Sequence, residues 1–262
     1  MSAIGTVVSR HRNNALLSLM VIGLGIALLA CAFLLFYVRD RVDPAAATTL
    51  HQAIVALAIA GPLAIVLGVF LRRGGWELGE YGIRRLPDSA EGTFLFSDLA
   101  ETAQFYRAGL SVHLGWRRRN QEKWYGANGN VSGYYKLLDR FMHGYIAARL
   151  PAVLDKLNAG GSETFRVASL GGALQRQFKV SLNSFAKVPT EALTVSRHRI
   201  SYEGNEINVA DIVAIDRSAW TSRLSFQLRS GSKVSVNYTL IFDGPLLIAL
   251  LDQLVPAPAG AP

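Results

Sequence analysis

Two long uncharged stretches near the start of the chain constrain what it can fold into. Ala15–Val38 holds 24 residues without a charged side chain, and Ala53–Leu71 holds 19 more. A helix rises about 1.5 Å per residue and the hydrocarbon core of a bilayer is about 30 Å thick, so roughly 20 apolar residues span it. Both stretches therefore predict transmembrane helices. The connection Arg39–Gln52 is short, so the helices must be antiparallel, and residues 1–73 are expected to form a transmembrane hairpin.

The first stretch follows two arginines, as the apolar part of a cleaved signal peptide would. Its 24 residues exceed the roughly 7–15 that are typical of such a segment. It also ends in the bulky Phe36-Tyr37-Val38 rather than in small residues. We therefore expect a retained span.

Six arginines flank the two spans and predict their orientation. The side that carries both termini has Arg10, Arg12, Arg72 and Arg73, and the opposite side has Arg39 and Arg41. Basic residues near span ends favour the cytoplasmic side. The sequence therefore predicts a multi-pass protein of the inner (plasma) membrane with both termini in the cytoplasm.

The net charge of +8 would favour a nucleic-acid partner if it were spread over a soluble domain. However, residues 1–73 hold six arginines against two aspartates, which is half of the excess. The remaining 21 basic and 17 acidic residues make an ordinary mixed surface, so no nucleic-acid binding is expected. The single cysteine, Cys31, lies inside the first span and excludes an intramolecular disulfide and a cysteine-based metal site.

After residue 73 the pattern predicts many short strands and two helices. The helices are Tyr134–Leu157, with apolar residues at steps of three and four, and Pro245–Leu254, for which Asp243 can serve as N-cap. Asp98–Tyr106 is ambiguous between strand and helix. The expected strands are Trp76–Leu86 with a turn at Gly79 or Gly82, Thr93–Phe96, Leu110–Trp116, Trp124–Tyr125, Phe165–Leu170, Gln177–Leu182, Leu193–Val195, Arg199–Tyr202, Glu206–Val209, Asp211–Asp216, Leu224–Leu228 and Lys233–Tyr238.

The order of these elements repeats. When Ile83 is placed over Ile200 and Asp98 over Asp211, both copies run through a similar length of strand and turn to a helix. Strands closed by one C-terminal helix can form a small core. We therefore expect one unit over residues 74–160 and a second over residues 161–255, followed by a disordered tail over residues 256–262.

The segment Leu193–Asp216 (LTVSRHRISYEGNEINVADIVAID) and the ending Ile241–Leu254 carry a resemblance. Both are similar to bacterial pleckstrin-homology-like (PH-like) domains. With the hairpin, the chain resembles two-pass bacterial membrane proteins of unknown function that carry such domains in tandem. The resemblance implies an α+β soluble region of two PH-like units, each made of antiparallel strands closed by a C-terminal helix. The sequence departs from the pattern where Val209 stands in place of a tryptophan, and Phe165–Pro189 reads as an insertion.

No set of residues predicts catalysis. The five histidines lack metal-ligand spacing, no GxSxG motif is present, and paired carboxylates such as Asp98/Glu101 are expected to bond backbone amides. We expect no enzymatic activity, no cofactor and no metal.

The best candidate site is a basic cluster with tryptophans on either side, expected at a hairpin tip. Basic residues of this kind suit an anionic membrane surface, and the resemblance implies phospholipid head groups as ligands. The alternative is a solvated turn. The candidate residues are Trp116, Arg117, Arg118, Arg119, Lys123 and Trp124.

The sequence is compatible with two functions. The first is a non-catalytic, membrane-anchored binding or scaffold module whose partners are the bilayer, anionic lipid head groups or a membrane protein. The second is an accessory subunit of a larger membrane complex, with small residues of the hairpin as the interface. Those small residues are Gly23, Gly25, Ala27, Ala30, Ala56, Ala60 and Gly61.

Overall fold

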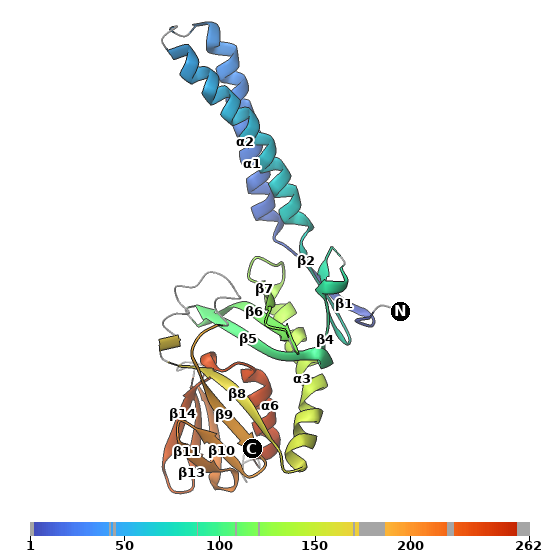
Figure 1. Cartoon of the computed structure of the whole chain (residues 1–262), viewed down its shortest axis with the longest axis vertical. Helices are drawn as coiled ribbons and strands as arrows, with labels where there is room; N and C mark the ends of the chain where they lie inside the picture. The colour runs from blue at the N-terminus through green and yellow to red at the C-terminus, as the bar shows by residue number, and fades with distance from the viewer. Residues whose placement is uncertain are drawn as a thin grey trace.

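The chain is elongated, with two long helices at one end and a sheet-rich region at the other (Figure 1). This computed structural model describes residues 3–41, 43, 46–87, 89–107, 109–119, 121–169, 171–172, 187–218 and 223–255. The expected strand Gln177–Leu182 and the tail 256–262 lie outside these residues.

The two apolar stretches form the helices α1 (Ala15–Val38) and α2 (Ala47–Arg73). α1 has the predicted bounds, whereas α2 begins six residues before the predicted span. Glycines let the helices approach closely, because a Cβ on Gly25 would lie 2.6 Å from the carbonyl oxygen of Gly61. The Ser18 hydroxyl also donates to the carbonyl of Gly68 at 2.6 Å.

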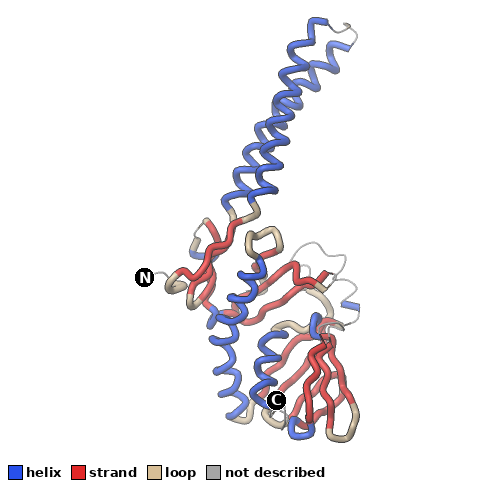
Figure 2. The backbone as a smooth tube through the Cα atoms, turned by 180° about the vertical axis from the view of Figure 1, so that it is seen from behind, coloured by secondary structure: helices blue, strands red, loops and turns tan. Residues whose placement is uncertain are grey.

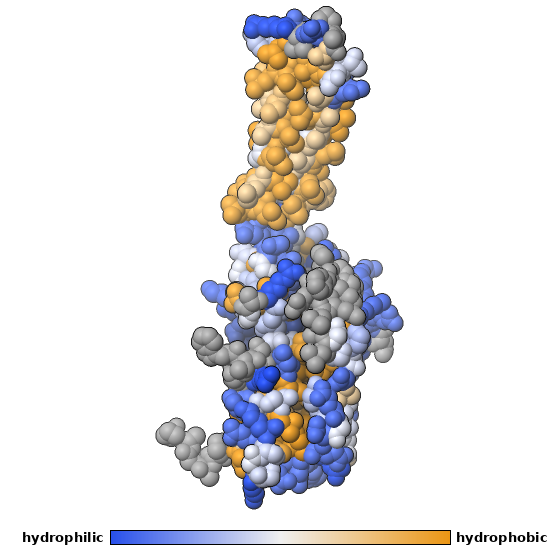
Figure 3. Space-filling view, turned by 90° about the vertical axis from the view of Figure 1, so that its left-hand side faces the viewer, coloured by the Kyte–Doolittle hydropathy of each residue, from blue (hydrophilic) through white to orange (hydrophobic). Residues whose placement is uncertain are grey.

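The outer surface of this hairpin is apolar almost throughout its length. Only 11% of the residues in the most apolar window of each helix are buried within the structure. In Figure 3 the exposed residues of the two helices form a continuous hydrophobic band, bounded by hydrophilic residues at both ends. By length and composition, both helices could cross a membrane.

A strand that the sequence did not reveal precedes α1. β1 (Val7–Arg12) pairs antiparallel with β2 (Gly75–Gly79), so that His11 lies opposite Trp76. The amide of Asn13 donates to the carbonyl of Gly74 at 3.0 Å. The chain therefore enters and leaves the hairpin through neighbouring paired strands, and Gly75 is a paired strand residue opposite Arg12 and Leu86. The expected boundary at residue 74 cuts through this sheet.

Within the described residues, the first half of the sheet-rich region has seven strands and a helix. One sheet has the order β1-β2-β3-β4 and the other β5-β6-β7, followed by α3. The remaining bounds are β3 Gly82–Leu86, β4 Thr93–Leu95, β5 Leu99–Arg107, β6 Leu110–Arg118, β7 Tyr125–Asn128 and α3 Tyr134–Asn158. Short 3-10 helices are η3 Ala90–Gly92 and η4 Phe96–Asp98, and η1 Arg39–Arg41 follows α1.

The second half repeats this arrangement. Its sheets have the orders β11-β10-β9-β8 and β12-β13-β14, followed by α6. The bounds are β8 Ser162–Ala168, β9 Thr190–Ser196, β10 Arg199–Tyr202, β11 Asn205–Asn208, η5 Val209–Asp211, β12 Ile212–Ser218, β13 Arg223–Leu228, β14 Lys233–Asn237, η6 Tyr238–Leu240 and α6 Gly244–Leu254. Asp98 and Asp211, which the sequence placed over each other, both end the 3-10 helix between the two sheets.

The repeat shows where the hairpin is inserted. Isolated bridges join Asn13 to Val131, shortly before α3, and Val167 to Ile241, shortly before α6. β1 therefore takes the place in the first half that β8 takes in the second. α1 and α2 lie in the β1–β2 connection, which corresponds to residues 169–189 between β8 and β9.

Both halves share one hydrophobic core. Trp76 and Trp116 meet edge to face with ring centroids 4.8 Å apart, and Phe141 of α3 lies 5.0 Å from Trp116. The same buried cluster continues to Leu193 of β9 and Leu247 of α6. The repeated units therefore pack as one body, with α3 and α6 in contact (Figure 2).

Candidate functional site

The expected tryptophan-flanked cluster is not an exposed tip. Trp116 is fully buried in the aromatic core. Trp124 is also buried and packs against Phe242, with ring centroids 5.9 Å apart. Neither indole is available to a membrane surface, because each fills space between strands and helices.

The basic residues of this cluster have separate surroundings. The Nε of Arg117 donates to Glu101 Oε2 at 3.0 Å. The guanidinium of Arg118 lies 4.7 Å above the Phe94 ring and donates to the backbone carbonyl of Thr93. β6 extends through both arginines, so they are strand residues rather than turn residues.

Arg119 and Lys123 are the exposed members of the cluster. The Lys123 ammonium lies 5.0 Å above the ring of Tyr125. The Arg119 amide donates to the carbonyl of Asp98 at 3.1 Å, which holds the start of this loop against η4.

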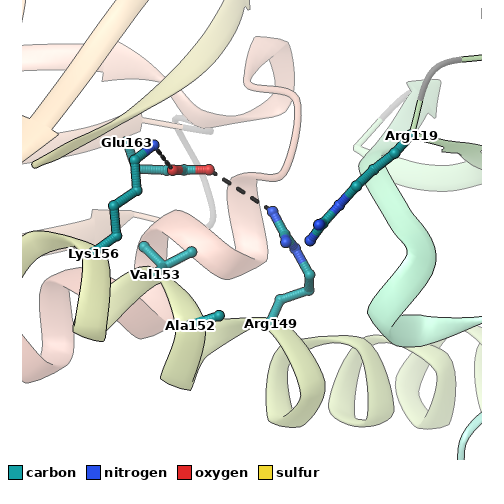
Figure 4. A pocket seen from close by; sticks show the side chains of 6 residues that line it. All are labelled: Arg119, Arg149, Ala152, Val153, Lys156 and Glu163. Carbon is teal, nitrogen blue, oxygen red and sulfur yellow. Dashed lines mark hydrogen bonds and ion pairs between the residues drawn. The ribbon is translucent and has the colours of Figure 1, made fainter.

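Arg119 instead belongs to a pocket between the two halves. The cavity measures about 330 Å³, and its charged residues come from three elements (Figure 4). α3 supplies one wall, β8 a second, and the β6–β7 loop the third. The lining residues are Arg119, Arg149, Ala152, Val153, Lys156 and Glu163.

The acceptors in this pocket do not balance its donors. Glu163 Oε2 receives a hydrogen bond from Lys156 Nζ at 2.8 Å, and Glu163 Oε1 lies 3.9 Å from an Arg149 terminal nitrogen. The buried Nε of Arg149 has no hydrogen-bond partner within the described residues. Figure 4 shows the Arg119 side chain reaching toward the Arg149 guanidinium. Three cations and one carboxylate leave the pocket with a formal charge of +2.

The helix α3 separates this pocket from the hairpin of α1 and α2. The loop before α3 meets the hairpin base, where the Ser132 amide donates to the Arg12 carbonyl at 2.7 Å. Arg149 lies 15 residues beyond the first residue of α3, or about 22 Å along the helix. α3 points away from α1 and α2 (Figure 1), so the pocket lies far from the hairpin, toward the C-terminal part of α3.

A second polar cluster joins the halves at the start of α6. The Oδ1 of Asp243 accepts hydrogen bonds from the amide and hydroxyl of Thr102, each at 2.7 Å, and from the Tyr145 hydroxyl at 2.9 Å. Burial, and secondarily the nearby Glu101 carboxylate, raises the pKa of Asp243 to about 7, although these hydrogen bonds oppose the rise. Asp243 occupies the expected N-cap position of α6, but its side chain makes no capping hydrogen bond.

Glu101 anchors the same junction. Its carboxylate accepts from Arg166 of β8 in a bidentate pair, at 2.7 and 2.9 Å, and also from Arg117. The Arg166 guanidinium lies 4.2 Å above the Phe242 ring. These contacts link β5 of the first half to β8 of the second, so they serve the fold rather than an open site.

No family model, curated protein or solved structure matches this chain. Among the residues that the structure describes, no three His, Cys, Asp or Glu side chains are grouped so as to hold a metal ion.

Sequence reasoning found Arg119 but missed its partners. Arg149 and Lys156 are seven residues apart, which places them on one face of α3. That spacing was a usable signal. The position of Glu163 and the approach of Arg119 depend on how β8 and the β6–β7 loop pack against the helix, which no local pattern encodes.

Proposed function

We propose that this chain is a non-catalytic, membrane-anchored binding or scaffold module. In this proposal α1 and α2 cross the inner (plasma) membrane, and the two repeated halves are PH-like units presented at its cytoplasmic face. The ligands or partners would then be bound close to the membrane.

The exposed apolar surface of the hairpin carries the proposal. Large side chains such as Leu24, Phe33 and Leu63 are each more than half exposed, and they lie on both helices. A patch of this extent on a soluble protein would associate with other apolar surfaces. A bilayer covers it completely, and helices of 24 and 27 residues are long enough to span one.

The strands at the hairpin base support a fixed placement of the units. Because β1 leads into α1 and β2 follows α2, the first sheet begins within one or two residues of each helix. The sheet-rich region is therefore held close to the membrane surface. The orientation rests on the arginines at the helix ends, among them Arg72 and Arg73 at the base, against Arg39 and Arg41 at the opposite end.

The PH-like assignment is supported by the element order. Each half has a four-stranded and a three-stranded antiparallel sheet followed by one helix. A binding role rather than catalysis follows from this assignment by analogy at the level of the fold.

Cell fractionation and a topology reporter test the anchoring. We expect the chain to stay with membranes through alkaline carbonate washing and to leave them in detergent. An export-dependent reporter fused after Pro262 should be inactive, and the same reporter inserted after Asp43, in the α1–α2 connection, should be active. Release by carbonate would refute the spans, and the reverse reporter pattern would refute the orientation.

A second candidate function is an accessory subunit of a larger membrane complex. Gly25 and Gly61 pack against each other inside the hairpin, but Gly23 faces open space, with nothing within 4 Å of an added Cβ. Ala27 and Ala30 of α1 are also exposed, so a small-residue surface is available to another helix. Purification in mild detergent distinguishes the two functions, because a stoichiometric membrane partner favours the subunit and isolation alone favours the free module.

A further inference from the structure

We propose that the pocket between α3, β8 and the β6–β7 loop binds the phosphate group of a soluble, phosphorylated small molecule. The inference deepens the proposed function by naming a ligand class, and it rests on that function only in taking the chain to be a binding module. The anchoring by α1 and α2 enters only where a soluble ligand is chosen over a lipid head group.

The charge of the pocket calls for an anion. Glu163 is shared between Lys156 and Arg149, and no other carboxylate among the described residues lines the cavity. The resulting formal charge of +2 matches a phosphate monoester, which carries about −1.5 to −2 near pH 7. A carboxylate ligand would supply only half of that charge.

Arg149 is held in place beside the cavity. Its side chain is 12% exposed, and its Nε is buried without a hydrogen-bond partner within the described residues. The same guanidinium interacts with the Tyr145 hydroxyl. A phosphate oxygen in the pocket would therefore accept from the terminal guanidinium nitrogens, one of which lies 3.9 Å from Glu163 Oε1, and not from the buried Nε.

Arginines in this arrangement favour a tetrahedral, multidentate anion. Arg119 extends toward Arg149 from the opposite wall (Figure 4), although two guanidinium groups repel each other. An anion between the two guanidinium groups would attract both of them. Each planar guanidinium can donate two parallel hydrogen bonds to two phosphate oxygens. Lys156, whose side chain is half exposed, adds a third positive group at the rim.

The cavity also has room for more than the phosphate. Its volume of about 330 Å³ is at the lower end of the range of roughly 300–1,000 Å³ that small-molecule sites occupy. Ala152 and Val153 provide an apolar wall beside the charged groups. These features fit a compact phosphate ester with an apolar or aromatic group.

The position of the pocket selects a soluble source. Arg149 lies about 22 Å along α3 from the end that contacts the hairpin base, and Lys156 lies further still. A lipid head group in the bilayer crossed by α1 and α2 would not reach it. The phosphate must therefore arrive from the aqueous side.

Isothermal titration calorimetry on the full chain in neutral detergent micelles tests the inference. The probes are phenyl phosphate, inorganic phosphate and benzoate, with sodium chloride added to equal ionic strength. We expect saturable binding of phenyl phosphate, weaker binding of inorganic phosphate, and little binding of benzoate.

Four variants locate the site. Arg119→Gln and Lys156→Gln each remove one positive group at the open side of the pocket and should weaken phenyl phosphate binding by roughly tenfold or more. Glu163→Gln removes the competing carboxylate and should strengthen it. Lys136→Gln changes an exposed lysine near the start of α3, outside the pocket, and is the matched control.

Three results would overturn the inference. The first is no phenyl phosphate binding up to about 10 mM, weaker than any specific site of this kind. The second is an equal effect of Lys136→Gln and Arg119→Gln. The third is binding to vesicles of anionic phospholipid that Arg119→Gln weakens, with no binding of phenyl phosphate. Because micelles replace the bilayer, a failure here leaves membrane anchoring untouched, and a failure of anchoring leaves these titrations valid.

Discussion

Asp243 should make the stability of the sheet-rich region depend on pH, and Asp243→Asn should remove that dependence. The carboxylate is buried between the two halves and accepts three hydrogen bonds from Thr102 and Tyr145. Burial, followed by the charge of Glu101, raises its pKa from the usual 3.8 to about 7. In the unfolded chain neither effect persists.

The sign of this pH dependence follows from how many protons the folded and unfolded chains bind. Between about pH 4 and pH 7, folded Asp243 holds a proton that the unfolded chain has released. Its contribution to stability is therefore complete below about pH 4 and is lost as pH rises to about 7. One pKa unit corresponds to about 1.4 kcal/mol, so the rise of about three units predicts a loss of about 4 kcal/mol over this range.

Asparagine keeps the side-chain shape and an oxygen that can accept from Thr102 and Tyr145, but it does not ionise. We expect the Asp243→Asn chain to match the wild type within about 1 kcal/mol at pH 4 and to exceed it by up to about 4 kcal/mol at pH 8. His113 acts in the opposite sense, because burial and then the Arg107 charge lower its pKa. It is present in both chains and cancels in the comparison.

Urea unfolding in detergent, followed by tryptophan fluorescence at several pH values, measures the difference. Trp76, Trp116 and Trp124 are buried in the sheet-rich region and report its unfolding. Asp155→Asn, at an exposed position on α3, is the matched control and should leave the pH slope unchanged. A parallel pH dependence in wild type and Asp243→Asn would refute the reasoning.

Three further predictions concern the hairpin, the first sheet and the junction. Joining Asn13 to Gly74 through a short Gly-Ser linker in place of α1 and α2 should give a soluble, folded protein, because these two residues are already hydrogen-bonded to each other. Residues 74–255 alone should aggregate, because they lack β1. Size-exclusion chromatography and circular dichroism check both outcomes. Gly25→Leu should lower the thermal midpoint in detergent by several degrees through overpacking by about 1–3 kcal/mol, and Gly23→Leu, which faces open space, should not; equal midpoints would contradict the observed helix contact. Arg166→Gln should lower the free energy of unfolding in urea by about 1–3 kcal/mol, because it removes two hydrogen bonds from the buried Glu101. The control Arg199→Gln, which breaks an exposed pair with Glu206, should lower it by under about 1 kcal/mol.

Local patterns predicted most of the elements of this chain. α1 has the bounds of the uncharged run, and β10 has those of the predicted strand Arg199–Tyr202. The helix α3 differs from its prediction by one residue. Hydrophobic length and periodicity report burial along one segment, so these elements could be read without knowing what packs against them.

The repeat was also visible, because spacing is preserved where residue identity is not. The alignment of Asp98 with Asp211 placed both at the ends of corresponding 3-10 helices. β1 was missed because its sequence, VVSRHR, is largely polar and short. Its strand conformation comes from pairing with β2, which lies more than 60 residues later in the chain.

Side-chain surroundings were the least predictable property. Trp116 and Trp124 looked like parts of an exposed tip, but Trp116 packs among aromatic side chains of the first half and Trp124 packs against Phe242 of the second half. Asp243 looked like a helix cap, but β5 and α3 of the other half provide its hydrogen-bond donors. In each case the residue type allowed several environments, and only the neighbouring element selected one.

The sequence by itself therefore determined an apolar helical hairpin, the repeated order of strands and the two closing helices, because each depends on residues close together in the chain. Tertiary structure decided that the hairpin emerges from within a sheet, that the halves share one core, and that Arg119, Arg149, Lys156 and Glu163 meet in one pocket. The physical reason is that pairing partners and charge environments arise from contacts between distant segments, and these depend on how whole elements pack.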